Sequence, residues 1–116
     1  MKTLLIDIET APMLGFSWDI CKEQGSMDFI IRDWYMLCWC AKWLDQREIF
    51  TCALPDFEKA YKDNPEDDRH IVQHLHGLLN EADVVVTQNG NRFDLPKINA
   101  KFIQYKLPPV KSFKRV

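Results

Sequence analysis

The sequence predicts an α/β domain built on a mixed sheet, and three apolar patterns carry that prediction. Residues 3–10 hold a short apolar run of strand-forming residues, too short for a helix. Residues 83–87 are β-branched and apolar on both faces, which is typical of a central strand parallel to its neighbour. Helical spacing of apolar residues predicts one helix from Asp67 or Asp68 to Ala82 and another from Asp94 to Lys106.

The strongest strand signal lies between these elements. Residues 34–44 are apolar on both faces and rich in aromatics, and residues 47–53 follow a tight turn as the return strand of a hairpin. The aromatics indicate core packing, with a base-stacking platform as the alternative. We expect residues 13–33 to form a long loop or small excursion, residues 54–66 a surface connection, and residues 110–116 a short last strand.

Length and composition are those of one soluble domain spanning residues 1–116. The chain is 47% hydrophobic, and no apolar run approaches the length of a membrane helix. Met1 leads directly into the first strand without a signal peptide, so we expect a cytoplasmic protein with no membrane partner.

The cysteines and histidines do not form a zinc motif. No Cys-x-x-Cys occurs, and His70 and His74, one helical turn apart, are expected on a helix surface. Neither a zinc site nor a disulfide framework is therefore expected. We expect all four cysteines to be small core residues: Cys21, Cys38, Cys40 and Cys52.

Charge is distributed unevenly along the chain. The net charge is −2, yet residues 92–116 contain seven Lys or Arg and a single acidic residue, Asp94. Such a basic end beside an acidic body is typical of a surface that binds an anionic partner, or of a solvated helix face followed by a basic tail. Both interpretations stay open at this point.

Two carboxylates interrupt the first apolar run. Asp7 and Glu9 are two residues apart on a strand, so their side chains point to the same face. Like charges on one face repel, and a hard cation such as Mg²⁺ or Mn²⁺ is the usual way to hold such a pair. The alternative is that the strand simply ends here and Glu9 begins a loop.

A second motif follows the later strand. Residues 88–91 read Gln-Asn-Gly-Asn, a turn composed of residues that tolerate positive φ, and Asp94 is placed to cap the next helix. Together, Asp7-x-Glu9 and Asn89-Gly90-x-x-Phe93-Asp94 resemble the DEDD 3′–5′ exonuclease family of the ribonuclease H-like superfamily, particularly its phage and bacterial members. The resemblance covers nearly the whole chain.

The resemblance implies a ribonuclease H-like mixed sheet, with strands 1–3 antiparallel and later strands parallel to strand 1. It implies that Asp7, Glu9 and Asp94 hold two Mg²⁺ or Mn²⁺ ions and act in phosphodiester hydrolysis of DNA or RNA. Asn89 resembles the family's polar residue on the substrate side. Further nucleic-acid contacts are expected from Arg92, Lys97 and Lys101.

The chain also departs from the family pattern. No Asp follows Asp94, so the fourth carboxylate and its Tyr-x-x-x-Asp or His-x-x-x-Asp helix are missing. We therefore expect a C-terminally truncated domain with at least two helices, an incomplete metal site and weak or no activity. If the chain is phage-encoded, the host cytoplasm is its expected location.

Two other interpretations remain. The first is a non-catalytic nuclease-fold module that acts by binding or inhibition, and the second is a plain α/β domain with coincidental acidic motifs. Because the missing helices would leave sheet surface exposed, we also expect self-association or a partner chain that covers the exposed face.

Overall fold

A five-stranded mixed sheet forms the body of the protein. The computed structural model describes residues 1–18 and 27–116. The strand order is β5-β4-β1-β6-β7, with β1 spanning Thr3–Thr10, β4 Met36–Trp43, β5 Ile49–Ala53, β6 Val84–Val86 and β7 Lys114–Arg115. The β1–β4 and β4–β5 pairs are antiparallel, whereas β1–β6 and β6–β7 are parallel. The predicted mixed sheet, with a later strand parallel to the first, is confirmed.

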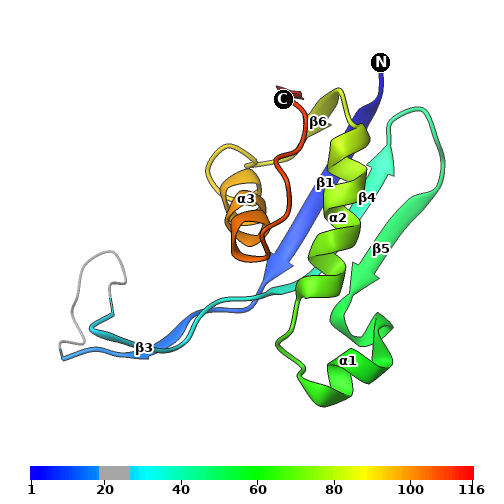
Figure 1. The fold of residues 1–116 in the computed structure, drawn as a ribbon. Coiled ribbons are helices and arrows are strands. Elements are labelled where there is room, and N and C mark those ends of the chain that lie inside the picture. Colours follow the sequence, from blue (N-terminus) through cyan, green and yellow to red (C-terminus); the bar gives the residue numbers. More distant parts are fainter. Residues whose placement is uncertain (19–26) are drawn as a thin grey trace.

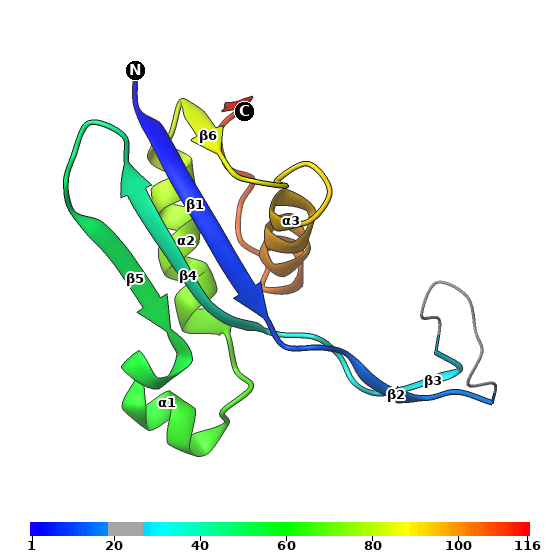
Figure 2. The ribbon, with the colours of Figure 1, turned by 180° about the vertical axis from the view of Figure 1, so that it is seen from behind.

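Two long helices cover one face of this sheet (Figure 1). These are α2 (Arg69–Glu81) and α3 (Asp94–Gln104). Their apolar stripes pack on the alternate residues Leu4, Ile6 and Ile8 of β1, all at most 5% exposed. The view from behind shows no described helix across the other face (Figure 2). The 34–44 segment is apolar in sequence on both faces, and the described elements cover only one of them.

Residues 36–43 form a strand with one buried and one open face. Trp39, Ala41 and Trp43 are buried, whereas Cys38 is half-buried and Cys40 is exposed. The Trp39 indole Nε1–H donates to the carbonyl oxygen of Ile71 on α2 (2.7 Å), so this buried ring keeps a hydrogen bond.

The prediction that the cysteines are core residues is therefore wrong for Cys40, which is on the open face. It holds for Cys52, where burial and nearby Asp56 raise the thiol pKa to about 11. Cys21 lies outside the described residues. When a strand is apolar on both faces, its sequence does not indicate which face will pack against the helices.

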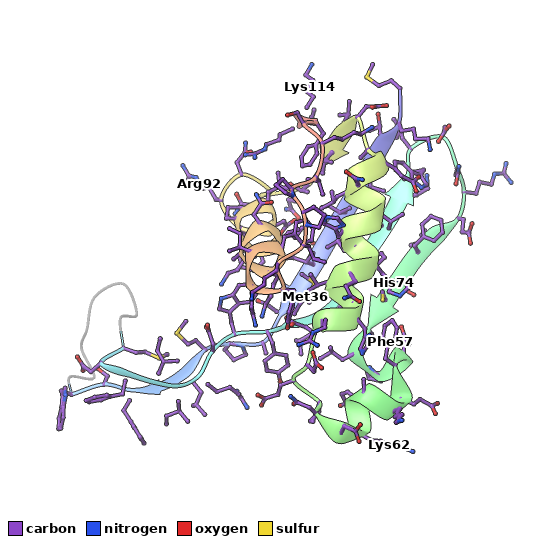
Figure 3. All side chains as sticks on the ribbon, viewed as in Figure 1. Met36, Phe57, Lys62, His74, Arg92 and Lys114 are labelled. Atoms are coloured by element: carbon purple, nitrogen blue, oxygen red, sulfur yellow. The ribbon has the colours of Figure 1, made fainter. Side chains whose placement is uncertain are left out.

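Residues 54–66 are more ordered than a simple surface connection. A 3-10 turn, η2 (Leu54–Asp56), leads into a short helix, α1 (Glu58–Asp63). The ring of Phe57, between them, packs against His70 and His74 of α2, with ring centroids 5.1 and 5.3 Å apart (Figure 3). These histidines are therefore helix-surface residues with an aromatic neighbour, as the sequence predicts.

The predicted excursion before the second main strand is a two-stranded hairpin. Its strands are β2 (Leu14–Phe16) and β3 (Phe29–Arg32), which pair antiparallel in a separate small sheet. The hairpin extends away from the body where β1 and β4 leave the main sheet (Figures 1 and 2). Among the described residues, no helix is both long and apolar enough to cross a membrane.

Candidate functional site

Asp7 and Glu9 lie on the open face of the sheet. Both side chains are exposed, because alternate residues of β1 turn the apolar Ile6 and Ile8 toward the helices. Across the ladder, Asp7 pairs with Cys40 and Glu9 with Cys38. The predicted shared direction of the two carboxylates is therefore observed.

The turn after β6 brings the second motif to the same place. Because β1 and β6 are parallel neighbours, their carboxyl ends point the same way, and the chain leaving β6 runs beside the second half of β1. An open pocket of about 520 Å³ is lined there by Asp7, Ile8, Glu9, Gln88, Asn89, Phe93 and Asp94. Four predicted site residues, Asp7, Glu9, Asn89 and Asp94, thus share one pocket.

Asp94 is the buried member of this group, at 5% exposure. Burial, followed by the negative charges of Asp7 and Glu9, raises the pKa of its carboxyl above the usual range. Asp94 is the first residue of α3 and not its N-cap, because Phe93 holds the cap position. The predicted capping role is wrong, and the carboxylate instead faces the other two acids across the pocket.

Close packing shapes the turn that carries Asn89. The backbone amides of Arg92 and Phe93 both donate to the Asn89 carbonyl oxygen, at 3.2 and 2.9 Å. A Cβ atom at Gly90 would collide with the Thr87 side chain, so this position has room for glycine alone. The residues of this turn tolerate positive φ, but among the described non-glycine residues positive φ occurs after α3, at Lys106 (56°).

The basic residues predicted for nucleic acid take three different positions. Arg92 lies at the outer edge of the loop before α3 (Figure 3) and lines a second hollow of about 250 Å³. That hollow shares Gln88 and Asn89 with the acidic pocket and adds Arg115 from β7. Sequence reasoning missed Arg115, because only the parallel pairing of β7 with β6 brings it beside Arg92.

Lys97 and Lys101 both lie against the ring of Trp34. The ammonium nitrogen is 4.1 Å from the ring centroid for Lys97 and 4.5 Å for Lys101. Lys97 remains half-exposed, but Lys101 is 3% exposed and forms an ion pair with Asp68 at 2.9 Å. Its ammonium group is thus engaged inside the protein, and we leave Lys101 out of the candidate nucleic-acid surface.

The donor atoms at the acidic pocket suit a hard divalent cation. They are carboxylate and amide oxygens, and Asp94 is buried beside the negative charges of Asp7 and Glu9, which a bound cation would offset. In the described part of the chain, however, no three His, Cys, Asp or Glu side chains are already arranged as a metal centre. Asp7 and Glu9 are exposed and have room to reorient.

The thiols beside the acids are poor candidates for ligands. Burial, followed by the nearby Glu9 and Asp7 carboxylates, raises the pKa of Cys38, and burial with Asp7 and Glu9 does the same for Cys40. As soft sulfur ligands they also suit Mg²⁺ and Mn²⁺ poorly, because these hard ions prefer oxygen.

Comparison with known proteins adds one match. A family model described as the RNase H superfamily matches residues 36–115. The matched stretch runs from the start of β4 through β7 and includes Asn89 and Asp94, while β1 with Asp7 and Glu9 precedes it. No curated protein matches the chain.

Proposed function

The chain belongs to the RNase H superfamily, and we propose that it is a metal-dependent nuclease-type domain that acts on nucleic acid as a 3′–5′ exonuclease-like phosphodiester hydrolase. One observation carries the proposal. Asp7 and Glu9 from β1 and Asp94 from α3 line a single open pocket with the amide side chain of Asn89. Two neighbouring carboxylates of β1 and a third from a distant part of the sequence converge here, and packing of the domain core does not require this arrangement.

Each residue has a role in this proposal. Asp7, Glu9 and Asp94 would hold Mg²⁺ or Mn²⁺, which supplies an activated water and stabilises the leaving 3′ oxygen when bound. The Asn89 amide would bind the substrate next to the reacting phosphate. Arg92 and Arg115, in the adjoining hollow, would hold a neighbouring phosphate of the strand by charge-assisted hydrogen bonds.

Metal binding can be tested by thermal unfolding with added Mn²⁺. We expect Mn²⁺ to raise the melting temperature, because an ion that binds only the folded state stabilises it by mass action. Asp7→Asn should abolish that shift. Asp45→Asn, an exposed acid in the β4–β5 turn outside the pocket, should keep it. No shift in the parent chain, together with a more stable Asp7→Asn, would mean that the acids only repel each other.

A second candidate is a non-catalytic module that binds nucleic acid or a protein through the same fold. It is favoured by the observation that the described acidic side chains do not form a complete metal arrangement. A 5′-labelled single-stranded oligonucleotide separates the two. We expect weak Mg²⁺-dependent shortening from the 3′ end, lost in Asp7→Ala, for the nuclease. Binding that survives EDTA, without any shortening, would favour the module.

A further inference from the structure

The β2–β3 hairpin, together with its flanking residues 13–18 and 27–33, forms an arm that stands off the body (Figures 1 and 2). At its base, the Ala11 amide donates to the Tyr35 carbonyl oxygen (2.8 Å), which continues the β1–β4 ladder outward. The radius of gyration is 15.7 Å, compared with about 13 Å expected for a compact chain of this size. The longest dimension of the molecule reaches 50 Å.

The arm exposes large apolar side chains. Phe16, Trp18 and Phe29 are 65, 84 and 56% exposed, and Leu14, Ile30 and Ile31 are each about half-exposed. With about 150–250 Å² for each aromatic side chain, these three rings alone offer roughly 400 Å² to a partner. A hairpin of two strands is marginally stable by itself in water. Its apolar surface therefore calls for a cover.

The charges of the described part of the arm, residues 13–18 and 27–33, disfavour a nucleic-acid partner. Arg32 is the one basic residue of its described part, and it pairs with Glu66 (3.0 Å) and lies over the Tyr35 ring. Asp28 accepts a hydrogen bond from the Trp18 amide (2.7 Å). Binding to phosphates needs available cations, whereas exposed aliphatic and aromatic side chains without excess charge are typical of a protein interface.

The chain carries a second apolar surface that the described elements leave open. On the face of the sheet opposite α2 and α3, a hollow of about 220 Å³ has a mainly apolar lining, to which β1, β4 and β5 contribute Leu5, Ile6, Asp7, Cys40, Ala41, Lys42 and Ile49. Ile49, on the outer strand β5, is 64% exposed. This apolar half of the open face, around Leu5 and Ile49, meets the acidic pocket at Asp7, which lines both, and the pocket continues from there toward Glu9.

We propose that two copies of the chain associate by exchanging arms, so that the arm of each copy packs on the apolar half of the open sheet face of the other. The interface is isologous, and each copy supplies one arm and one face. Two arms of roughly 400 Å² each, with equal areas on the two faces, bury about 1,600 Å², the standard size of a stable interface. This pairing does not require nuclease activity.

Sedimentation at micromolar concentration with three single variants tests the proposal. We expect the parent chain to sediment at twice its 13.7 kDa monomer mass. Trp18→Glu on the arm and Ile49→Glu on the face should each give monomers with an unchanged circular dichroism spectrum, because both side chains are exposed. Ile103→Glu is the matched control. This side chain is 78% exposed on α3, which covers the other side of the sheet, so the control should remain dimeric.

A mixture of the two monomeric variants provides the decisive measurement. Trp18→Glu keeps an intact face and Ile49→Glu keeps an intact arm, so an equimolar mixture should regain a weaker dimer through one native contact. A monomeric parent chain would overturn the proposal. Loss of the dimer in Trp18→Glu but not in Ile49→Glu would overturn it in favour of arm-to-arm pairing. A monomeric parent whose oligonucleotide affinity falls in Trp18→Glu would assign the arm to nucleic acid.

Discussion

At the scale of single residues, Asp94 is the acid of the pocket whose negative charge is most unfavourable. It is buried beside two other acids, and its pKa is raised above the usual value. A raised folded-state pKa means that the folded protein binds this proton more tightly than the unfolded chain does. The resulting stability is fully present below the unfolded pKa and is lost as pH rises through the folded pKa. At neutral pH without metal, the charged Asp94 therefore destabilises the fold.

We predict that Asp94→Asn raises the melting temperature at pH 7 in EDTA by a few degrees. The loss of a negative charge at the start of α3 opposes this gain by about 0.3–1 kcal/mol. The gain should shrink as pH falls through the carboxyl range, because the parent side chain then becomes neutral as well. Thermal unfolding across that range measures the effect. A variant that is equally stable at low pH but less stable than the parent at pH 7 would contradict the prediction.

Residue patterns predicted the acidic pocket better than they predicted its surroundings. The alternation of β1 was sufficient to place Asp7 and Glu9 on one face. Lys101 looked like a surface cation because it follows Lys97 by one helical turn. The preceding apolar residues do not reveal that Asp68, 33 positions earlier in the chain, lies opposite its ammonium group. The ion pair depends on how α2 and α3 pack together, and the spacing of residues along one helix does not predict that packing.

At the scale of elements, a buried polar network fixes α3 to the rest of the fold. The Lys101 ammonium group contacts Asp68 at the start of α2 and donates to the Trp34 carbonyl oxygen at 3.3 Å. Asp68 also accepts hydrogen bonds from the Met36 amide (2.7 Å) and from the Tyr105 hydroxyl. Burial and the bond to Asp68 raise the pKa of Tyr105, so this hydroxyl remains a donor. The network therefore joins α2, α3 and the start of β4.

We predict that Lys101→Met destabilises the protein by about 3–5 kcal/mol, because it leaves the Asp68 carboxylate buried without its counter-charge. Urea unfolding measures the loss. The double variant Asp68→Asn with Lys101→Met should recover part of it, since the Asn carbonyl still accepts from the Met36 amide. Lys97→Met is the matched control one turn earlier, and it removes contacts of the ammonium group with the Trp34 and Phe93 rings, which cost about 0.5–1 kcal/mol. Equal losses in the two single variants would contradict this account.

Elements with strong periodicity could be predicted, and elements stabilised by packing could not. The helical spacing of Leu75 and Leu79 gave α2, and the run of β-branched residues gave β6. In contrast, α1 is six residues long without a buried side chain, so it leaves no apolar pattern to detect. The β2–β3 arm was visible only as a long connection, because its strands are three and four residues long and contain or adjoin glycine and charged residues.

At the scale of the whole molecule, the two faces of the sheet have different roles. One face packs against α2 and α3 and forms the core (Figure 2). The other face carries the acidic pocket and the apolar hollow. A sequence with apolar residues on both sides of the 34–44 strand predicts two covered faces. The half-buried and exposed positions Cys38 and Cys40 show that the described chain covers one.

The charge distribution gives a last prediction on nucleic-acid binding. Although the chain carries a net charge of −2, Arg92 and Arg115 meet at the hollow beside the acidic pocket. If they bind phosphates of a single strand, removing one should lower the affinity and make its salt dependence shallower by about 0.7 in the slope of log K against log salt. We therefore predict this change for Arg92→Gln and for Arg115→Gln, measured by fluorescence anisotropy with a labelled oligonucleotide.

The control for this prediction is Lys59→Gln, which removes an exposed cation from α1, at the end of the fold away from Arg92 (Figures 1 and 3). A long-range effect of net charge would change all three variants alike, because each loses one positive charge. A direct phosphate contact changes the slope only for Arg92→Gln and Arg115→Gln, since each counterion released belongs to one neutralised phosphate. Equal slopes for Lys59→Gln and the two arginine variants would show that Arg92 and Arg115 do not contact phosphates of the strand. The hollow beside the acidic pocket would then not be part of the nucleic-acid binding surface.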